Sequence, residues 1–384
     1  MHLLISGPPG SGKTTFIRTF FQNLTSAAGF YTEEIPGKGE RQGFKIKTFS
    51  GKEAVFAEKG LESPYKLGAY GLDLKAFETI ALDCLEQASV SEAEIVIIDE
   101  IGKMELNSKQ FQKAVGRVLE RKKVIAAVPD KYEHSFLTAL KKRKDVCLLK
   151  IRRDNTEQVR EIAQLWVKAL ECAQIKALDR KAIALGLSEV LLIENAASNL
   201  AGFVQTVAED KELLFISGRG NNGADVLSCC RKLYCRGYKV KAVIVSDKEL
   251  NQEAGFQRGL LEKFFSLTVI GKEEDTALLK NLCGQADLIV EGLIGTGIRG
   301  KADGLYAQAI EIINQSGKKV VACDIPSGLL PDQGYSGGPT VKADWTVTFL
   351  APKKGFFLNR GQDFCGKIIL TDIGVSRSAL MQLR

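Results

Sequence analysis

The segment Gly7–Thr14, with the sequence GPPGSGKT, constrains this chain more than any other feature of its 384 residues. It fits the pattern G-x-x-x-x-G-K-[ST], follows the apolar run Leu3–Ser6 and precedes the helix-like stretch Thr15–Phe20. A strand, a glycine-rich turn and a helix in this order let backbone N–H groups converge on a polyphosphate at the start of the helix. The sequence therefore predicts a phosphate-binding loop within an α/β domain.

A second feature supplies the acidic residues that such a loop needs. The apolar strand Ile95–Asp99 ends in a carboxylate, and Glu100 follows directly. We expect Lys13 to reach the β- and γ-phosphates, Thr14 and Asp99 to hold Mg²⁺, and Glu100 to orient or deprotonate the attacking water. The predicted nucleotide-binding residues are Gly7, Pro8, Pro9, Gly10, Ser11, Gly12, Lys13, Thr14, Thr15 and Arg41.

Arg41 is included as a hypothesis, because a cationic side chain in a glycine-rich segment could act as an arginine finger in cis. Its alternative is an exposed, solvated arginine. The same loop and acids would also serve a nucleotide or nucleoside kinase, in which a hydroxyl replaces water. Since no lid signature is found in the sequence, hydrolysis is the favoured reaction and kinase activity the alternative.

Composition excludes several other classes of protein. The two histidines and the absence of any C-x-x-C pair argue against a zinc site or a histidine-dependent nucleophile. The longest apolar runs are far too short to span a bilayer, and the first residues do not resemble a signal peptide. With nine cysteines expected as reduced thiols, a cytoplasmic location is expected. The net charge of +7 suits anionic substrates, and nucleic acid is not expected as a partner.

Apolar runs alternate with helical patterns along the chain, which indicates parallel sheets and the α/β class. Asn155–Ile175 has the periodicity of one long amphipathic helix, and a fresh strand–helix series begins after it. We therefore predict two domains, residues 1–172 and residues 173–384.

The second half contains its own glycine-rich loop. The strand Leu213–Ser217 leads into Gly218–Gly223, which fits G-x-G-x-x-G, and Asp247 follows at a spacing that suits a ribose-binding acid. Further loops follow the strands that end at Glu291 and Asp324. Because the carboxyl ends of parallel strands meet at one edge of a sheet, we expect the side chains listed next to converge. They are Asn222, Glu291, Asp324 and Ser327, whose oxygens suit a hard cation or a proton-transfer site.

The first half resembles the cancer-related nucleoside-triphosphatase family. The resemblance rests on Gly29–Ile35, on Asp99–Leu106 with the sequence DEIGKMEL, and on Val124–Pro129. It covers nearly all of residues 1–172. It implies a small P-loop fold that hydrolyses nucleoside triphosphates with Mg²⁺ and broad base tolerance.

The second half resembles the YjeF N-terminal family, the NAD(P)H-hydrate epimerases. The resemblance rests on Ala177–Ile183, Ile193–Ala196, Gly218–Asp225, Asp324–Gly328 and Pro352–Gly355. It implies a Rossmann-like three-layer fold that follows the P-loop NTPase domain. It also implies metabolite repair, in which the two epimers of NADH or NADPH hydrated on the nicotinamide ring are interconverted.

The resemblance also implies roles for individual residues. Asp225 and Asp324 would perform acid/base catalysis, and Asn222, Glu291 and Ser327 would hold K⁺. The residues implied to bind the hydrated cofactor are Asn221, Asn222, Gly223, Ala224, Asp225, Gly295, Thr296, Gly297, Ile298, Arg299, Gly300, Lys301 and Asp324. A separate ADP- or ATP-dependent NAD(P)H-hydrate dehydratase is the expected partner, and a homodimer is expected by resemblance.

The chain departs from the family pattern N-N-G-G-D-G at two positions, where it carries Ala224 and Val226. If residue 224 had a positive φ, alanine would cost about 1 kcal/mol there. Val226 is expected to crowd a bound nucleotide, and Glu291 stands in place of the usual aspartate. The alternative to an active epimerase is therefore a ligand-binding domain tethered to an active NTPase.

Overall fold

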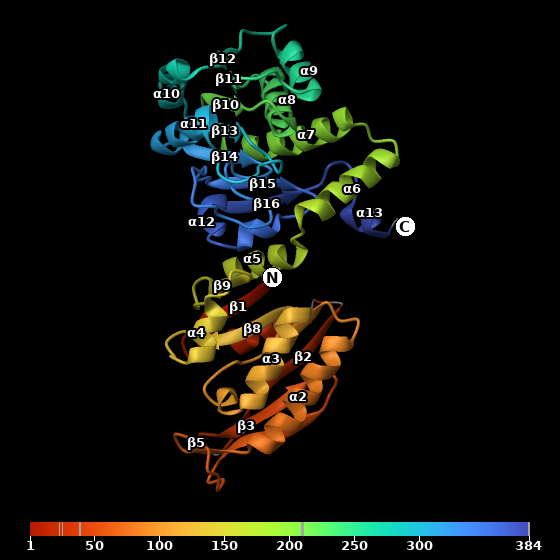
Figure 1. Ribbon diagram of the computed structural model, residues 1–384, viewed down its shortest axis with the longest axis vertical. Helices are drawn as coiled ribbons and strands as arrows, with labels where there is room; N and C mark the ends of the chain where they lie inside the picture. Colours follow the sequence, from red (N-terminus) through yellow and green to blue (C-terminus); the bar gives the residue numbers. More distant parts are fainter. Residues whose placement is uncertain (23, 25, 38–39, 209–210, 383–384) are drawn as a thin grey trace. The chain divides into compact units, whose positions relative to one another are not determined.

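The computed structural model describes residues 1–22, 24, 26–37, 40–208 and 211–382 (Figure 1). The chain divides into two compact units, Met1–Gln164 and Leu165–Arg384. Each unit has a parallel or mixed sheet and its own buried core, so the fold is α/β throughout. The predicted domain boundary between residues 172 and 173 stays a prediction.

Unit 1 contains, among the described residues, a nine-stranded sheet in the order β5-β6-β4-β3-β2-β7-β8-β1-β9. Strands β2, β7, β8, β1 and β9 are parallel, and β3 to β6 extend the sheet as an antiparallel meander. The strands are β1 (His2–Gly7), β2 (Ala27–Pro36), β3 (Arg41–Thr48), β4 (Glu53–Lys59), β5 (Lys66–Leu67), β6 (Tyr70–Leu72), β7 (Ile95–Ile98), β8 (Lys123–Pro129) and β9 (Val146–Lys150). The helices are α1 (Lys13–Phe21), α2 (Leu74–Val90), α3 (Lys109–Arg121), α4 (Ser135–Lys141), α5 (Thr156–Lys168) and the 3₁₀ turn η1 (Glu105–Asn107).

The core of unit 1 explains why these segments fold. Helix α3 is amphipathic and buries Phe111 against Phe30 of β2 and Phe77 of α2, with ring centroids 5.2–6.3 Å apart. Strand β1 is buried along its whole length between β8 and β9. Its carboxyl end is therefore held rigidly where the glycine-rich loop begins.

Unit 2 contains, within the described residues, a seven-stranded parallel sheet in the order β12-β11-β10-β13-β14-β15-β16. The strands are β10 (Leu213–Ser217), β11 (Val240–Val245), β12 (Thr268–Ile270), β13 (Leu288–Gly292), β14 (Lys319–Cys323), β15 (Trp345–Phe349) and β16 (Lys367–Thr371). The helices are α6 (Cys172–Ala184), α7 (Glu189–Val207), α8 (Asn221–Cys235), α9 (Gln252–Leu261), α10 (Thr276–Gln285), α11 (Gly304–Gln315), α12 (Gln362–Cys365) and α13 (Arg377–Gln382), with 3₁₀ turns η2 (Glu273–Asp275) and η3 (Lys354–Phe357).

Two separate apolar clusters make unit 2 a three-layer fold. Helices α6, α7 and α8 bury Leu178, Leu200 and Leu227 on one face of the sheet, and α10 and α11 bury Leu279 and Ile310 on the other. The chain runs outward from β10 to β12 and then returns to β13, so the strand order reverses between β10 and β13. Ligands of open parallel sheets bind at such a reversal.

Most predicted strands occur within one residue of their expected limits, whereas one expected helix needs correction. Asn155–Ile175 is not one helix, because α5 ends at Lys168 and α6 begins at Cys172. Glu171 caps α6 through a reciprocal capping box with Gln174, which favours a new helix start there. The meander β3 to β6 was not predicted strand by strand. Among the described residues, no single helix has the length and apolar content to cross a membrane, although α6 and α7, bent by 116°, meet those criteria as a pair.

Candidate functional sites

The glycine-rich loop of unit 1 lies between β1 and α1, as predicted. Gly12 has a φ of 89°, a conformation that favours glycine, and it turns the chain directly into α1. The Lys13 side chain is buried, and its Nζ donates to the carbonyl oxygens of Gly7 at 3.0 Å and Pro8 at 3.4 Å. The ammonium group of Lys13 thus lies against the loop in which a phosphate group would bind.

The carboxylates at the end of β7 meet this loop. Thr14 Oγ1 donates to Asp99 Oδ1 at 3.2 Å, and Lys13 Nζ lies 3.7 Å from Glu100 Oε2. Asp99 is fully buried, and its Oδ2 has no hydrogen-bond partner within the described part of the chain. Burial raises the pKa of Asp99 to about 7, and the adjacent Glu100 contributes to that increase. Burial also raises the pKa of Glu100, although the Lys13 charge opposes this shift.

Glu105 is a third acid at this site, and the sequence reasoning did not single it out. It lies in η1, is 5% exposed, and accepts a hydrogen bond from the Gly102 N–H at 3.0 Å. A Cβ on Gly102 would lie 3.0 Å from both Glu105 Oε2 and Glu100 Oε1, so the two carboxyl groups flank the same glycine. Burial and the Glu100 charge raise the pKa of Glu105 to about 8. The sequence signal that could have identified Glu105 is its position within the family-specific DEIGKMEL stretch.

A cleft of about 280 Å³ adjoins the loop in unit 1. The predicted residues Gly10, Ser11, Gly12 and Thr15 line one side of it. The residues that sequence reasoning missed are Phe16 and Thr19 of α1, together with Arg153, Thr156 and Arg160 from the β9–α5 region. Arg41 is not among the lining residues. Its guanidinium pairs with Glu34 and lies 5.1 Å from the centre of the Phe44 ring, so its role as an arginine finger remains a hypothesis.

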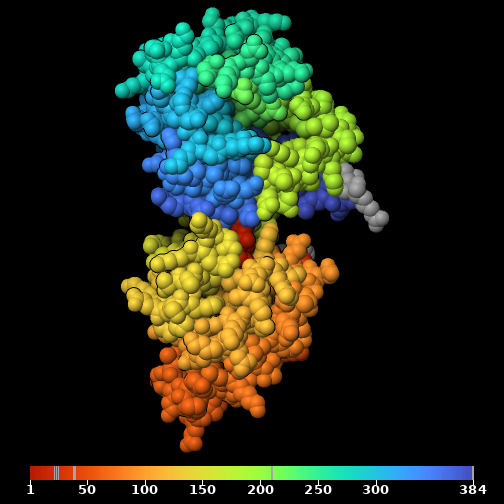
Figure 2. Space-filling view, in the orientation of Figure 1, coloured from red at the N-terminus to blue at the C-terminus, as the bar shows by residue number. Residues whose placement is uncertain are grey.

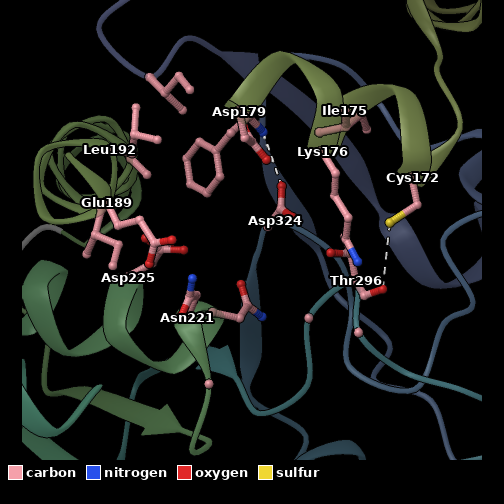
Figure 3. A pocket seen from close by; sticks show the side chains of 18 of the residues that line it. Cys172, Ile175, Lys176, Asp179, Glu189, Leu192, Asn221, Asp225, Thr296 and Asp324 are labelled. Carbon is pink, nitrogen blue, oxygen red and sulfur yellow. Dashed lines mark hydrogen bonds between the residues drawn. The ribbon is translucent and has the colours of Figure 1, made fainter. Parts of the chain in front are cut away.

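Unit 2 contains a pocket of about 750 Å³ at the reversal of strand order (Figure 3). Helices α6 and α7, the start of α8, the loop after β13 and the end of β14 all contribute to its lining. In the space-filling view, the yellow-green segment of α6 and α7 borders the cyan and blue segments of the same unit (Figure 2). Such a volume at this position can hold a nucleotide.

The pocket brings together part of the predicted set of binding residues. Those that line it are Asn221, Asn222, Asp225, Gly295, Thr296, Gly297 and Asp324, whereas Gly223, Ala224, Ile298, Arg299, Gly300 and Lys301 are not among its lining residues. Gly223 has a structural role, because a Cβ there would lie 2.1 Å from the Gly218 carbonyl oxygen. Asp247 is exposed and is also not among the lining residues, so the expected ribose-binding position is not supported.

The expectations about Ala224 and Val226 need correction. Ala224 has a helical backbone inside α8 and is fully buried beside Ile193 and Ala254, so alanine costs nothing through φ. Val226 is also fully buried, and its Cγ2 lies 2.6 Å from the place where a Cβ on Gly292 would stand. Val226 therefore packs against β13 and is not among the residues that line the pocket.

Glu291 and Ser327 form a buried hydrogen-bonded pair, and Asn222 is a further buried polar residue on the pocket wall. The Ser327 N–H and Oγ donate to Glu291 at 3.0 Å and 2.6 Å, and the Leu293 N–H donates at 3.2 Å. Burial raises the pKa of Glu291 to about 7. Both polar side-chain atoms of Asn222 are buried without a hydrogen-bond partner among the described residues. An unpartnered amide oxygen and a buried carboxylate are the kinds of oxygen ligand that suit a hard cation such as K⁺.

Asp324 is the most strongly constrained acid of the pocket. It has a φ of 61°, which is unusual for a residue other than glycine. Its Oδ1 accepts hydrogen bonds from Thr348 Oγ1 and from the Phe349 N–H, both at 3.3 Å, and from the buried Lys353 Nζ. Lys353 and Asp179 line the same pocket, although sequence reasoning gave them no role. Both lie in stretches on which the family resemblance rested.

Comparisons with known proteins match unit 1 and unit 2 to two different families. The NTPase family model matches residues 2–164, and the model for the N-terminus of YjeF-related proteins matches residues 189–355. The nucleoside-triphosphatase THEP1 of Thermotoga sp. strain RQ2 is 42% identical over 155 residues, which are 40% of this chain and 88% of the relative. The NAD(P)H-hydrate epimerase of Rhodopirellula baltica is 31% identical over 221 residues, which are 57% of this chain and 89% of the relative.

Further matches include a longer curated relative and two solved structures. The bifunctional NAD(P)H-hydrate repair enzyme Nnr of Coxiella burnetii is 34% identical over 208 residues, and the chain spans 41% of its length. The crystal structure of THEP1 from Aquifex aeolicus is 32% identical with a TM-score of 0.39, over 42% of this chain and 96% of that one. The crystal structure of yeast ynu0 is 22% identical with a TM-score of 0.44, over 53% and 87%. On the sequence relatives, this chain belongs to the nucleoside-triphosphatase THEP1 family in its first half and to the NAD(P)H-hydrate epimerase family in its second.

Proposed function

We propose that unit 1 hydrolyses nucleoside triphosphates to diphosphate and phosphate with Mg²⁺. The observation that carries this proposal is the contact of the loop with two strand-end carboxylates, Thr14 with Asp99 and Lys13 with Glu100. Thr14 Oγ1 and the unpartnered Asp99 Oδ2 are the oxygens that would hold Mg²⁺. When bound, the ion supplies positive charge for the phosphate oxygens.

Residues of the chain itself would bind the phosphates, activate the attacking water and stabilise the leaving group. Lys13 Nζ, which donates to the carbonyl oxygens of Gly7 and Pro8, would exchange these partners for phosphate oxygens. Glu100, beside Lys13, would orient the attacking water and accept its proton, because burial moves its pKa toward neutrality. The backbone N–H groups of the loop would stabilise the charge of the leaving diphosphate.

Phosphate release without any added acceptor tests this reaction against the kinase alternative. We expect the wild-type chain to release phosphate from ATP and GTP when only water is present. Glu100→Gln should lower the turnover rate by about 100-fold while nucleotide binding is retained. Glu94→Gln, a change at an exposed acid on the far end of β7, is the matched control. Phosphate transfer that requires a nucleoside or nucleotide acceptor would instead favour the kinase.

We further propose that unit 2 interconverts the epimers of hydrated NADH and NADPH. The observation that carries this proposal is a nucleotide-sized pocket that has Asp225, Asp324 and the unpartnered Asn222 on its wall. The epimeric carbon carries a hydroxyl group and is bonded to the ring nitrogen. Loss of that hydroxyl as water gives a flat iminium carbon, and water can then return to either face.

Asp225 and Asp324 would handle the protons in this reaction, and neighbouring carboxylates would favour the cationic iminium. Asn222, Glu291 and Ser327 would hold K⁺, which when bound supplies a fixed positive charge beside the pocket. The cofactor phosphates would lie near the start of α8, where backbone N–H groups point outward. A separate ADP- or ATP-dependent NAD(P)H-hydrate dehydratase would consume one epimer.

The test starts from an unequal mixture of the epimers of hydrated NADPH, with K⁺ present. We expect the full chain to restore the equilibrium ratio, measured by chromatography, and Asp225→Ala to lose this activity. Replacing K⁺ by Na⁺ should slow the exchange. No exchange above background would make unit 2 a ligand-binding module and leave the NTPase as the catalyst.

A further inference from the structure

We propose that Asp179 and Lys353 complete the proton-transfer machinery of unit 2, with Lys353 holding the carboxylate of Asp324 in place as the base and Asp179 sharing the acid role with Asp225. This inference rests on the proposed epimerase function. Asp179 would be a catalytic residue, because it lines the pocket that takes the reacting ring. Lys353 would be a positioning residue, because it acts through Asp324.

The arrangement of the three acids is the first argument. Asp179 comes from α6, Asp225 from α8 and Asp324 from the end of β14, and all three face one pocket. Figure 3 shows their side chains around a common space, where a ring could meet different acids on its different sides. Such an arrangement suits epimerisation, because water leaves one face of the carbon and returns to the other.

The distribution of charge is the second argument. Lys353 is 1% exposed, and its Nζ contacts Asp324 Oδ1 and Thr348 Oγ1, the latter at 2.9 Å. This buried ammonium group, together with the Thr348 hydroxyl and the Phe349 N–H, fixes the position of the Asp324 carboxylate. Among the described residues, the carboxyl groups of Asp179 and Asp225 have neither an ion pair nor a hydrogen bond that would do the same.

The remaining charged groups around Asp179 lie at the pocket rim. Lys176 and Arg180 of α6 are exposed, as is Arg219 before α8, and Glu189 of α7 adds a further carboxylate. Burial, and then the charge of Asp324, raise the pKa of Asp179 to about 6, against the opposing charges of Lys353 and Lys176. Burial raises the pKa of Asp225 well above its ordinary value. Asp179 can therefore both release and regain a proton near neutral pH.

The proposed cycle balances without any oxidant or reductant. Protonated Asp179 gives its proton to the hydroxyl, the C–O bond breaks with its electron pair on oxygen, and water leaves. The lone pair of the ring nitrogen forms the C=N bond of the iminium ion. Water then adds to the opposite face, the new C–O bond forms, and ionised Asp324 takes the released proton. Transfer of that proton to Asp179 through solvent restores the starting state.

Titration of the full chain tests the charge assignment without any substrate. With ¹³Cγ-labelled aspartate, we expect one carboxyl signal with a midpoint near pH 6 that disappears in Asp179→Asn. Lys353→Met removes a charge that opposes the shift of Asp179 and should raise the Asp179 midpoint, whereas Lys354→Met, at an exposed ion pair with Glu171, should leave it unchanged. A midpoint for Asp179 at the ordinary value of about 4 would overturn the proposal.

Kinetics then tests the catalytic assignment. Asp179→Asn should lower kcat for epimer exchange by about 100-fold with KM nearly unchanged and should remove a limb of the pH profile near pH 6. Asp179→Glu should restore part of the rate, and Asp363→Asn, at a surface ion pair, is the control. Lys353→Arg provides a second variant if Lys353→Met does not fold.

The outcomes separate the two proposals. An active wild type with an equally active Asp179→Asn overturns this inference and leaves the epimerase function intact. A wild type without exchange overturns the epimerase function, and the mechanism assigned to Asp179 falls with it.

Discussion

Replacing Val226 by glycine restores the residue of the family pattern and tests whether this position faces the ligand or the core. Val226 is fully buried and packs over Gly292 of β13. Its side chain has three carbon atoms, and at about 0.8 kcal/mol for each buried carbon their loss costs about 2.4 kcal/mol. Glycine in a helix costs about 0.5 kcal/mol more than valine. We therefore expect Val226→Gly to destabilise unit 2 by about 3 kcal/mol without accelerating epimer exchange.

Tryptophan fluorescence measures this change selectively. Both tryptophans of the chain, Trp166 and Trp345, belong to unit 2. For a unit of this size, a loss of about 3 kcal/mol lowers Tm by roughly 6–12 °C. Val226→Ala should cost only about 1 kcal/mol, because one carbon is kept and alanine favours the helix. An unchanged Tm for Val226→Gly, or faster exchange, would refute the placement of Val226 in the core.

Three further predictions follow from the two sites. A carboxyl group whose pKa rises on folding stabilises the fold when it is protonated, so the stability contributed by Glu105 is lost as pH rises from 4.5 to about 8. Glu105→Gln should therefore make unit 1 more stable than the wild type by up to about 5 kcal/mol near pH 9, and equally stable near pH 4. Thermal melts followed by circular dichroism measure this difference. Removal of Mg²⁺ with EDTA should abolish phosphate release, and added Mg²⁺ should restore it; release that persists in EDTA would contradict the role given to Thr14 and Asp99. Ser327→Ala removes one hydrogen-bond donor to Glu291 and should raise the K⁺ concentration needed for half-maximal epimer exchange by about tenfold. An unchanged K⁺ response would place the cation elsewhere.

The local patterns of the sequence were enough to predict the parallel strands and both loops. Runs such as Leu213–Ser217 are buried on both faces of the sheet and are therefore apolar throughout, which makes them easy to recognise. The meander of unit 1 was harder to predict, because strands such as β3 and β4 are partly exposed and lack a clear apolar run. The end of α5 at Lys168 was missed because the amphipathic pattern continues across residues 169–171 into α6.

The candidate sites were predictable where a motif carries the residues and not where folding brings them together. The glycine-rich loop and the end of β7 are recognisable segments. The structure joins them through Thr14 with Asp99 and Lys13 with Glu100. Arg153 and Arg160 reach the cleft of unit 1 only because α5 follows β9, next to β1 in the sheet. Val226 points into the core because Gly292 of β13 has no side chain and leaves room for it. The local sequence pattern around Val226 does not reveal this contact.

The entry of the chain into unit 2 limits where that unit can be cut for separate expression. Leu170 accepts a backbone hydrogen bond from the Lys354 N–H at 2.9 Å and donates one to the Pro352 carbonyl oxygen at 3.0 Å. These bonds fasten the residues before α6 to the segment that carries Lys353. A fragment that starts at residue 173 would lack both bonds and the cap of α6 at Glu171. A fragment that begins before Leu165 keeps these bonds and the cap. The two fragments should therefore differ in the burial of Lys353, although both contain every residue of the pocket after Cys172.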